Sequence, residues 1–451
     1  MKLPPALYAV LAVFLILTGV YSSLTPYRQG GFLKHQRDPA TGGPQRAEDI
    51  GAPDERQHAN YIAFVKSGKG FPVLVPGSPD AYENYQAHQP PLYYILAAGW
   101  STVTGADPTD PGAGFRLRFL NSLIGIGTLL GIYFAGIWGL RRQDVALAAT
   151  AFAALLPMNI ALHAAVSNDP LLYCLVTWVF ALSLKGIHEG WDNKVALTIG
   201  LLAGLGLLTK TTALVCFPVI LGAFLISWRK NGAKPGLQAV ALALVLPAIL
   251  ASPWLMRNKS LYGDFFALSV FNAAFTGSPQ ASLFIGALGA WGYWLNMVLW
   301  WTARSFVGAF GYMDVFLFDS MRPDQSGALY SAIFAILAGI VILGLLGLKA
   351  ESAKAAEEDL PAPSHLLILS AVLLVFATAL FIRFNMQYFQ GQARYLFPAL
   401  VAFSYFFAFG AVRLTKDKPQ SAWIVPAVFL GLLNLAALQA ISEGFPLRLG
   451  Q

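Results

Sequence analysis

Long runs of apolar residues recur along most of the chain and constrain its fold more than any other feature. A helix needs about 20 mostly apolar residues to cross the hydrocarbon core of a bilayer. Runs of this kind lie near residues 5–24, 116–139, 145–163, 170–187, 195–209, 212–228, 236–255, 327–348, 364–382, 395–412 and 421–441. They predict an all-α polytopic membrane protein with about 11 transmembrane helices in a single domain, residues 1–451.

The composition agrees with a membrane protein. Of the 451 residues, 56% are hydrophobic and 12% are charged, whereas soluble proteins contain about 25% charged residues. The first apolar run resembles a signal peptide, but no clear small-residue cleavage site follows it, so we expect a retained first helix. The two cysteines, Cys174 and Cys216, both lie inside apolar runs; they exclude a disulfide framework or a zinc site built from cysteines.

The positions of the basic residues predict the orientation. Clusters lie at 141–142, 185–194, 229–234, 349–359 and 413–418, whereas the short loops 164–169 and 384–393 contain no Lys or Arg. Basic residues concentrate in cytoplasmic loops, so the amino terminus is expected inside, with two large insertions, about 25–115 and 256–326, on the outer side. This distribution also argues that the net charge of +7 does not reflect nucleic-acid binding.

Two further apolar segments, 91–105 and 283–303, are ambiguous between spanning and interfacial helices. A span at 283–303 would place the basic cluster 413–418 outside, against the charge rule. Both segments are rich in Trp and Tyr, which favour the headgroup region, so we expect both to lie in the membrane interface.

The outer insertions and the adjoining helix ends carry the residues that are candidates for chemistry. Asp54 and Glu55 form an acidic pair, and a carboxylate can act as a general base if its surroundings set its pKa. Adjacent helical residues do not face the same way, so one of them can enter a cavity while the other orients it. The alternative is that Pro53-Asp54-Glu55 is only a helix start. His58 lies one turn later.

Other polar residues are expected on the same face. His88 precedes a rigid Pro90-Pro91 turn, and Asn168 and Asp169 either cap a helix or line a site. Lys210, Arg257 and Arg394 lie at helix ends, where each alone is an interfacial anchor. Three cations opposite a carboxylate loop favour a phosphate site, because arginine binds phosphate in a bidentate way and lysine as a point charge.

These residues resemble the motifs of the GT-C superfamily of integral-membrane glycosyltransferases, of the protein-mannosyltransferase and aminoarabinose-transferase type. The matching pieces cover most of the chain: Pro53-Asp54-Glu55-x-x-His58-x-x-Tyr61, His88-x-Pro90-Pro91-Leu92-Tyr93-Tyr94, Arg118-x-x-Asn121, Ser167-Asn168-Asp169, Leu208-Thr209-Lys210, Pro253-Trp254-x-x-Arg257-Asn258, Tyr262-Gly263-Asp264, Phe310-Gly311-Tyr312 and Gln392-x-Arg394-Tyr395.

The resemblance implies an inverting transfer of a sugar from a polyprenyl-phosphate donor to a hydroxyl of a glycan, lipid or protein acceptor. It implies Asp54 as the general base and Glu55 as the second acid. Lys210, Arg257 and Arg394 are then expected to bind the donor phosphate. The cavity is expected to include His58, Tyr61, His88, Asn168, Asp169 and Asp314.

The resemblance places the protein in a membrane, which we expect to be the bacterial inner membrane, with the site on the periplasmic side. Some relatives bind a divalent metal, Mg²⁺ or Mn²⁺, but here the cations favour a metal-independent reaction. Two alternatives remain, a secondary transporter and a lipid-binding membrane protein without catalysis.

Overall fold

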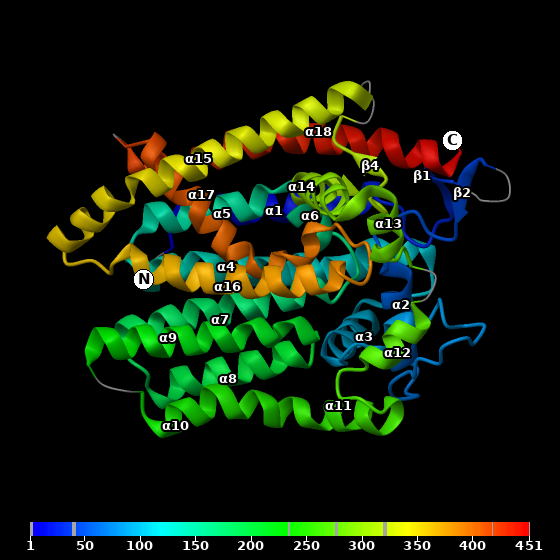
Figure 1. Ribbon diagram of the computed structural model, residues 1–451, viewed down its shortest axis with the longest axis horizontal. Coiled ribbons are helices and arrows are strands. Elements are labelled where there is room, and N and C mark those ends of the chain that lie inside the picture. The colour runs from blue at the N-terminus through cyan, green and yellow to red at the C-terminus, as the bar shows by residue number, and fades with distance from the viewer. Residues whose placement is uncertain are drawn as a thin grey trace.

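Long helices lying side by side make up most of the computed structural model, which describes residues 3–37, 42–232, 235–275, 278–318, 323–416 and 418–450 (Figure 1). Ten helical stretches in these ranges are long and apolar enough to cross a membrane, or eleven if a bent pair counts as one span. The all-α polytopic prediction is therefore confirmed. The helices outside the two insertions are α1 (Pro5–Leu24), α4 (Gly114–Leu140), α5 (Gln143–Leu155), α6 (Pro157–His163), α7 (Asp169–Glu189), α8 (Asn193–Leu207), α9 (Cys216–Asn231), α10 (Leu237–Val240), α11 (Leu246–Tyr262), α15 (Pro323–Glu357), α16 (Pro363–Asn385), α17 (Leu400–Leu414) and α18 (Ile424–Leu449), of which α6 and α10 are short.

The predicted helix at 145–163 is broken. α5 and α6 meet at an angle of 66°, and the break falls at Leu156, whose φ and ψ of −68° and 115° are extended. A residue before proline avoids the helical region because the proline ring would clash with its backbone, so Pro157 ends α5 and starts α6.

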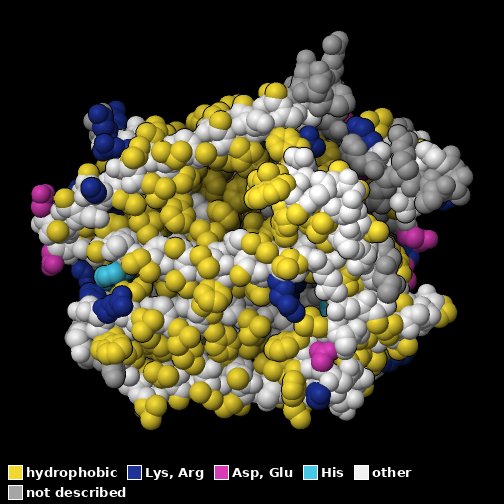
Figure 2. Space-filling model, viewed as in Figure 1, with side chains coloured by type: hydrophobic (Ala, Val, Ile, Leu, Met, Phe, Trp, Pro, Cys, Tyr) yellow, Lys and Arg dark blue, Asp and Glu magenta, His cyan; other side chains and the backbone are white. Residues whose placement is uncertain are grey.

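Hydrophobic side chains cover the middle of the face shown in Figure 2, whereas charged side chains gather towards its two ends. Among the described residues, well-exposed apolar side chains include Ile249, Leu346, Val375 and Leu435. Exposed apolar area of this extent is unusual on a soluble protein, but it suits helices that face lipid. Inside, helices approach closely at glycine: a Cβ on Gly410 of α17 would lie 1.9 Å from the carbonyl oxygen of Ile340 in α15.

The two long insertions fold together at one end of the helices. They form α2 (Glu55–Lys66), α3 (Leu92–Thr104), α12 (Leu268–Ala274), α13 (Ala281–Trp291), the π-helical segment Gly292–Leu299, α14 (Trp300–Val307) and two small hairpins. In the hairpins, β1 (Gly31–Arg37) pairs with β2 (Pro44–Ala47) and β3 (Ala309–Phe310) with β4 (Val315–Phe316). Leu74 and Ala87 from the first insertion pack with Ala267 and Val270 from the second.

Basic clusters predicted to lie inside meet at the other end. Arg142 binds Glu351 across 2.5 Å, and the Lys230 ammonium lies 3.3 Å from His188 Nδ1. The separation of the basic clusters from the two insertions, inferred from charge, is thus present in the fold.

The two ambiguous segments differ in length. α3 has 13 residues and is too short to cross a bilayer at 1.5 Å per residue. The stretch Ala281–Val307 is long and apolar enough to cross, but α14 is seen end-on in Figure 1 while the long helices run across the picture. Its crosswise direction favours the predicted interfacial position.

Candidate active site

A cavity of about 1190 Å³ lies at the end formed by the two insertions. Its walls come from both insertions, from the start of α7, from the connection between α8 and α9, and from the end of α16. The predicted site residues that line it are Asp54, His58, His88, Asp169, Lys210, Asp314 and Arg394. Segments far apart in the sequence therefore meet at one place.

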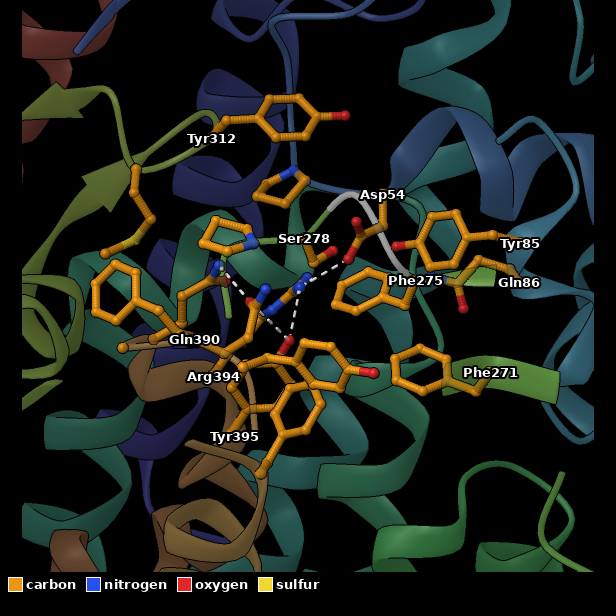
Figure 3. Close-up of a pocket in the computed structure, with 18 of the residues that line it drawn as sticks. Asp54, Tyr85, Gln86, Phe271, Phe275, Ser278, Tyr312, Gln390, Arg394 and Tyr395 are labelled. Carbon is orange, nitrogen blue, oxygen red and sulfur yellow. Dashed lines mark hydrogen bonds and ion pairs between the residues drawn. The ribbon is translucent and has the colours of Figure 1, made fainter. Parts of the chain in front are cut away.

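Asp54 caps the start of α2 in an unusual backbone conformation. Its φ of 64° lies in the left-handed region, which aspartate tolerates better than most side chains. The carboxylate lies 2.7 Å from Arg394 Nη2, as the dashed line in Figure 3 marks. Burial raises the pKa of Asp54, but the charge of Arg394, a hydrogen bond from Tyr85 and the proximity of His58 outweigh it, so the pKa lies below the usual value.

Two hydrogen bonds fix the backbone at Arg394 and at the preceding residue, Ala393. The Tyr173 hydroxyl donates to the carbonyl of Arg394 (2.8 Å), and the amide of Ala393 donates to Ser305 Oγ (2.7 Å). The guanidinium lies 5.1 Å from the ring centre of Tyr395 and donates to the Tyr395 hydroxyl. Its Nε is buried without a hydrogen-bond partner among the described residues.

A second ion pair lies next to the first. Lys210 Nζ is 2.6 Å from the carboxylate of Asp169 at the first residue of α7. Lys210 adopts an extended backbone between α8 and the following 3-10 turn, which frees its side chain from both helices. The lysine lies 6.0 Å from the ring centre of Tyr395. Two carboxylates and two cations thus alternate around this part of the cavity.

Both histidines face the cavity in neutral form. His58 Nδ1 pairs with the Tyr94 hydroxyl (2.9 Å), and His88 Nδ1 pairs with the carbonyl of Tyr85 (2.6 Å). Burial lowers the pKa of His58 to about 3 and that of His88 to about 4. Neither ring therefore adds positive charge to a bound phosphate near neutral pH.

Tyr61 and Asn168 do not line the cavity but lie behind the residues that do. The Tyr61 ring stacks on Tyr94 at 3.6 Å and its hydroxyl donates to the carbonyl of Gln89. The Asn168 amide donates to the carbonyl of Thr209 (3.2 Å). These contacts support the residues that face the cavity.

Glu55 points away from the cavity. Its carboxylate takes two hydrogen bonds from Arg118, at 2.8 and 2.5 Å, and one from the amide of Val166 at 2.7 Å. Arg118 also donates to the carbonyls of Ser22, Thr25 and Pro26. With no exposed surface, Glu55 lacks access to a substrate, in contrast to the expected catalytic position. It joins α2 to α4 instead.

Arg257 does not line the cavity either, in contrast to the expected phosphate contact. Its Nη2 donates to the carbonyl of Pro72 (2.9 Å), and its guanidinium lies 4.5 Å from the ring centre of Trp254. Asp314 lines the cavity, but its carboxylate is occupied by Arg448 of α18 and by the backbone amide of Lys34 (2.8 Å).

Several lining residues were not singled out from the sequence. Asp49 lies in an irregular segment, and Tyr85 and Gln86 lie in a short 3-10 turn (Tyr85–His88) without a motif pattern, so only the folded chain brings them to the cavity. Exposed Arg383, at the end of α16, also lines it. One further wall is apolar and aromatic, contributed by Phe271, Phe275, Phe284, Trp301, Leu380, Phe381 and Phe384.

Residues 80–403 match a known protein family, described as "Predicted membrane protein (DUF2142)". This match covers more than half of the chain. The chain belongs to the DUF2142 family. No curated protein matches it by sequence.

Solved structures similar to this DUF2142 protein are GT-C glycosyltransferases. ArnT from Cupriavidus metallidurans, bound to undecaprenyl phosphate, aligns with a TM-score of 0.53 and 12% identity over 98% of this chain and 76% of that one. The Archaeoglobus fulgidus oligosaccharyltransferase, in complex with Zn and sulfate, aligns with a TM-score of 0.54 and 14% identity over 96% of this chain and 53% of that one. The DUF2142 protein thus spans about half the length of the oligosaccharyltransferase. Its fold is of the GT-C type, as the sequence resemblance predicted.

Proposed function

We propose that this protein is an inverting glycosyltransferase that moves a sugar from a polyprenyl-phosphate donor to an acceptor hydroxyl. The observation that carries the proposal is the meeting of Asp54, Arg394 and Lys210 in one cavity that also has an apolar aromatic wall. A lipid-linked phosphate needs cations for its head and an apolar path for its chain. The undecaprenyl phosphate bound by ArnT, a protein of the same fold, is a ligand of this class.

In the proposed reaction, Asp54 accepts the proton of the acceptor hydroxyl. The hydroxyl oxygen forms a bond to the anomeric carbon, while the bond from that carbon to the phosphate oxygen breaks. The electron pair leaves with the polyprenyl phosphate, whose growing negative charge is stabilised by Arg394 and Lys210. A single displacement of this kind inverts the anomeric carbon.

The Asp54–Arg394 pair fits a donor-dependent base. While Arg394 neutralises Asp54, the low pKa of the carboxylate makes it a weak base. A donor phosphate competes for Arg394 because guanidinium binds phosphate well. Loss of that partner raises the pKa of Asp54, so binding of the donor itself strengthens the base.

We propose that no metal takes part. Asp54 and Asp169, the acids nearest the cations, are each paired, with Arg394 and Lys210. Within the described ranges, no three His, Cys, Asp or Glu side chains are grouped so that they could hold a metal ion. Because both acids are already neutralised by cations of the chain, we propose that these cations, rather than a divalent ion, supply the positive charge.

We propose that the site lies at the outer face of a bacterial inner membrane. The basic clusters at the other end of the helices favour the cytoplasmic side, so the cavity is expected on the outer side. A transporter is less well supported, since its substrate site is expected near the middle of the membrane between paired halves. Here residues of both insertions line the cavity, and the insertions lie at one end of the helices (Figure 1).

The test is to supply purified protein with labelled polyprenyl-phosphate hexose or pentose and to measure released polyprenyl phosphate and glycosylated product. The wild type is expected to turn over, and Asp54→Asn to lose about 10²–10⁴-fold in kcat as expected for a missing general base. Asp107→Asn, at an exposed carboxylate outside the cavity, is the matched control. Full activity of Asp54→Asn, or activity lost on chelation and restored by Mg²⁺ or Mn²⁺, would contradict this scheme.

A further inference from the structure

The cavity has a second polar region beyond Asp54. Asp49, Tyr82, Gln86 and Tyr312 line it, and in Figure 3 Tyr312 lies on the opposite side of Asp54 from Arg394 and Tyr395. These four residues are separate from the ion pairs and from the apolar wall described above. Tyr312 belongs to the Phe310-Gly311-Tyr312 motif, whereas Asp49, Tyr82 and Gln86 belong to none of the sequence motifs, and the proposed donor uses none of the four.

Two side chains here are buried with an unused hydrogen-bond acceptor. Asp49 is 2% exposed; its Oδ1 accepts from the amide of Gly51 (3.0 Å), but its Oδ2 has no partner in the described part of the chain. Gln86 is 5% exposed, and its Oε1 likewise lacks a partner there. A buried polar atom without a hydrogen-bond partner lowers the stability of the fold. Both atoms here are oxygens that accept hydrogen bonds, so each needs a donor group.

The electrostatics of this region exclude a strongly charged ligand. Burial raises the pKa of Asp49 to about 7, with Glu55 adding to the rise and Gly51, Arg118 and Arg56 opposing it. Both arginines are occupied, Arg118 by Glu55 and Arg56 by Glu83 at 2.9 Å. An anion here would meet the Asp49 carboxyl while the two arginines that act on Asp49 are already paired. A carboxyl that titrates near neutrality is a poor partner for a fixed cation.

Tyrosine rings complete the region. Burial, together with the charges of Asp49 and Asp54, raises the pKa of the Tyr312 hydroxyl. Tyr312 and Tyr82 line the same cavity as both acids. Amphipathic tyrosine faces can pack on the C–H surface of a sugar ring while nearby oxygens accept its hydroxyl hydrogens. Exposed Arg46 and Glu48, of opposite charge, lie at the rim.

We propose that Asp49 and Gln86 bind a neutral saccharide acceptor, accepting hydrogen bonds from its hydroxyl groups so that one of them lies against Asp54. This inference rests on the proposed transferase function and specifies its acceptor class. Asp49 and Gln86 position the acceptor, while Asp54 remains the base.

The test uses the full-length protein with a labelled polyprenyl-phosphate hexose and three kinds of probe: neutral hexose oligosaccharides, a serine- and threonine-containing peptide, and an amino sugar. Transfer and release of polyprenyl phosphate are measured separately. Asp49→Ala and Gln86→Ala are expected to raise the acceptor KM for oligosaccharide about tenfold or more, the effect of a lost hydrogen bond to a buried group. Their donor KM should stay near the wild-type value, as should all parameters of the exposed Asp80→Asn control. Asp49→Ala also removes the acceptor of the Gly51 amide, so kinetic constants are compared per folded molecule.

A milder effect is expected for Asp49→Asn, which keeps an acceptor oxygen. Saturation-transfer NMR with the oligosaccharide and the donor-free protein gives a readout independent of turnover, and Asp49→Ala should abolish that signal. Donor turnover with the peptide or amino sugar alone, or oligosaccharide transfer indifferent to Asp49 and Gln86, would overturn this inference and leave the proposed function standing. Oligosaccharide binding lost in Asp49→Ala, without donor turnover, would support the saccharide site and contradict the transferase. Absence of saccharide binding and transfer in every protein tested would also overturn the inference.

Discussion

Asp54 and Arg394 face each other across 2.7 Å in a cavity that neither segment could form alone. Asp54 begins α2 in the first insertion, and Arg394 follows α16 in the connection to α17. The pair places a carboxylate and a guanidinium where a hydroxyl nucleophile and a leaving phosphate would meet. The coupling free energy between the two side chains can be measured without assaying a reaction.

Removal of both partners should cost less than the sum of the two single removals. Arg394→Ala leaves Asp54 as a mostly buried charge, and we expect the free energy of unfolding to fall by about 2–4 kcal/mol. In the double variant with Asp54→Asn, the loss should be smaller than the sum by about 1–3 kcal/mol. Unfolding of the four proteins in mixed detergent micelles measures this coupling; additive losses would show that the pair contributes no mutual stabilisation.

The Glu55–Arg118 pair should matter for folding rather than for chemistry. Glu55→Gln leaves a buried guanidinium without its counter-charge, and such a change costs about 3–5 kcal/mol. We expect a lower thermal midpoint but an unchanged kcat per folded molecule. A variant of wild-type stability with a large loss of kcat would instead place Glu55 in the reaction.

Neutral His58 should make the protein less stable in acid. Its pKa is about 3 in the folded state and about 6.5 when unfolded, so between these values the unfolded chain binds more protons. Stability therefore falls as the pH drops below 6.5, by about 2 kcal/mol at pH 5 from this group.

The raised pKa of Asp49 acts in the opposite direction over the same range, so the contribution of His58 is isolated by comparison with His58→Gln. That variant should show a shallower loss of thermal stability between pH 7 and pH 5. An unchanged slope would mean that His58 is accessible to protons in the folded protein.

The orientation can be tested with single cysteines. Lys69 lies in the first insertion and Lys354 near the end of α15, and both are exposed. In intact bacterial spheroplasts, a membrane-impermeant maleimide should label Lys69→Cys, whereas Lys354→Cys should react only after permeabilisation. Native Cys174 and Cys216 are half-buried and buried, so background labelling should be low. The reverse pattern would invert the proposed sidedness.

The spans and the gathering of polar groups at one end could be predicted, because apolar length and loop charge are local properties of the sequence. That Asp54 and Glu55 face different ways was predicted from helical geometry, but Asp54 precedes α2 in the left-handed region, so a different backbone conformation produces the same result. The partners of Arg257 could not be predicted, since the carbonyls of Phe71 and Pro72 come from an irregular segment almost 190 residues away. The positions of Asp49 and Gln86 in the cavity could not be predicted either, because their burial depends on the whole fold.

The sequence separation of 340 residues between Asp54 and Arg394 also determines when their ion pair can form during synthesis. At ribosomal rates of about 5–20 residues per second, Asp54 emerges roughly 17–70 seconds before its counter-ion exists. During this interval the segment that contains Asp54 has already been synthesised, but Arg394, whose guanidinium lowers the pKa of the Asp54 carboxylate, has not. A nascent chain therefore has no completed charge pair, and chemistry in this cavity must wait until nearly the whole bundle has been inserted.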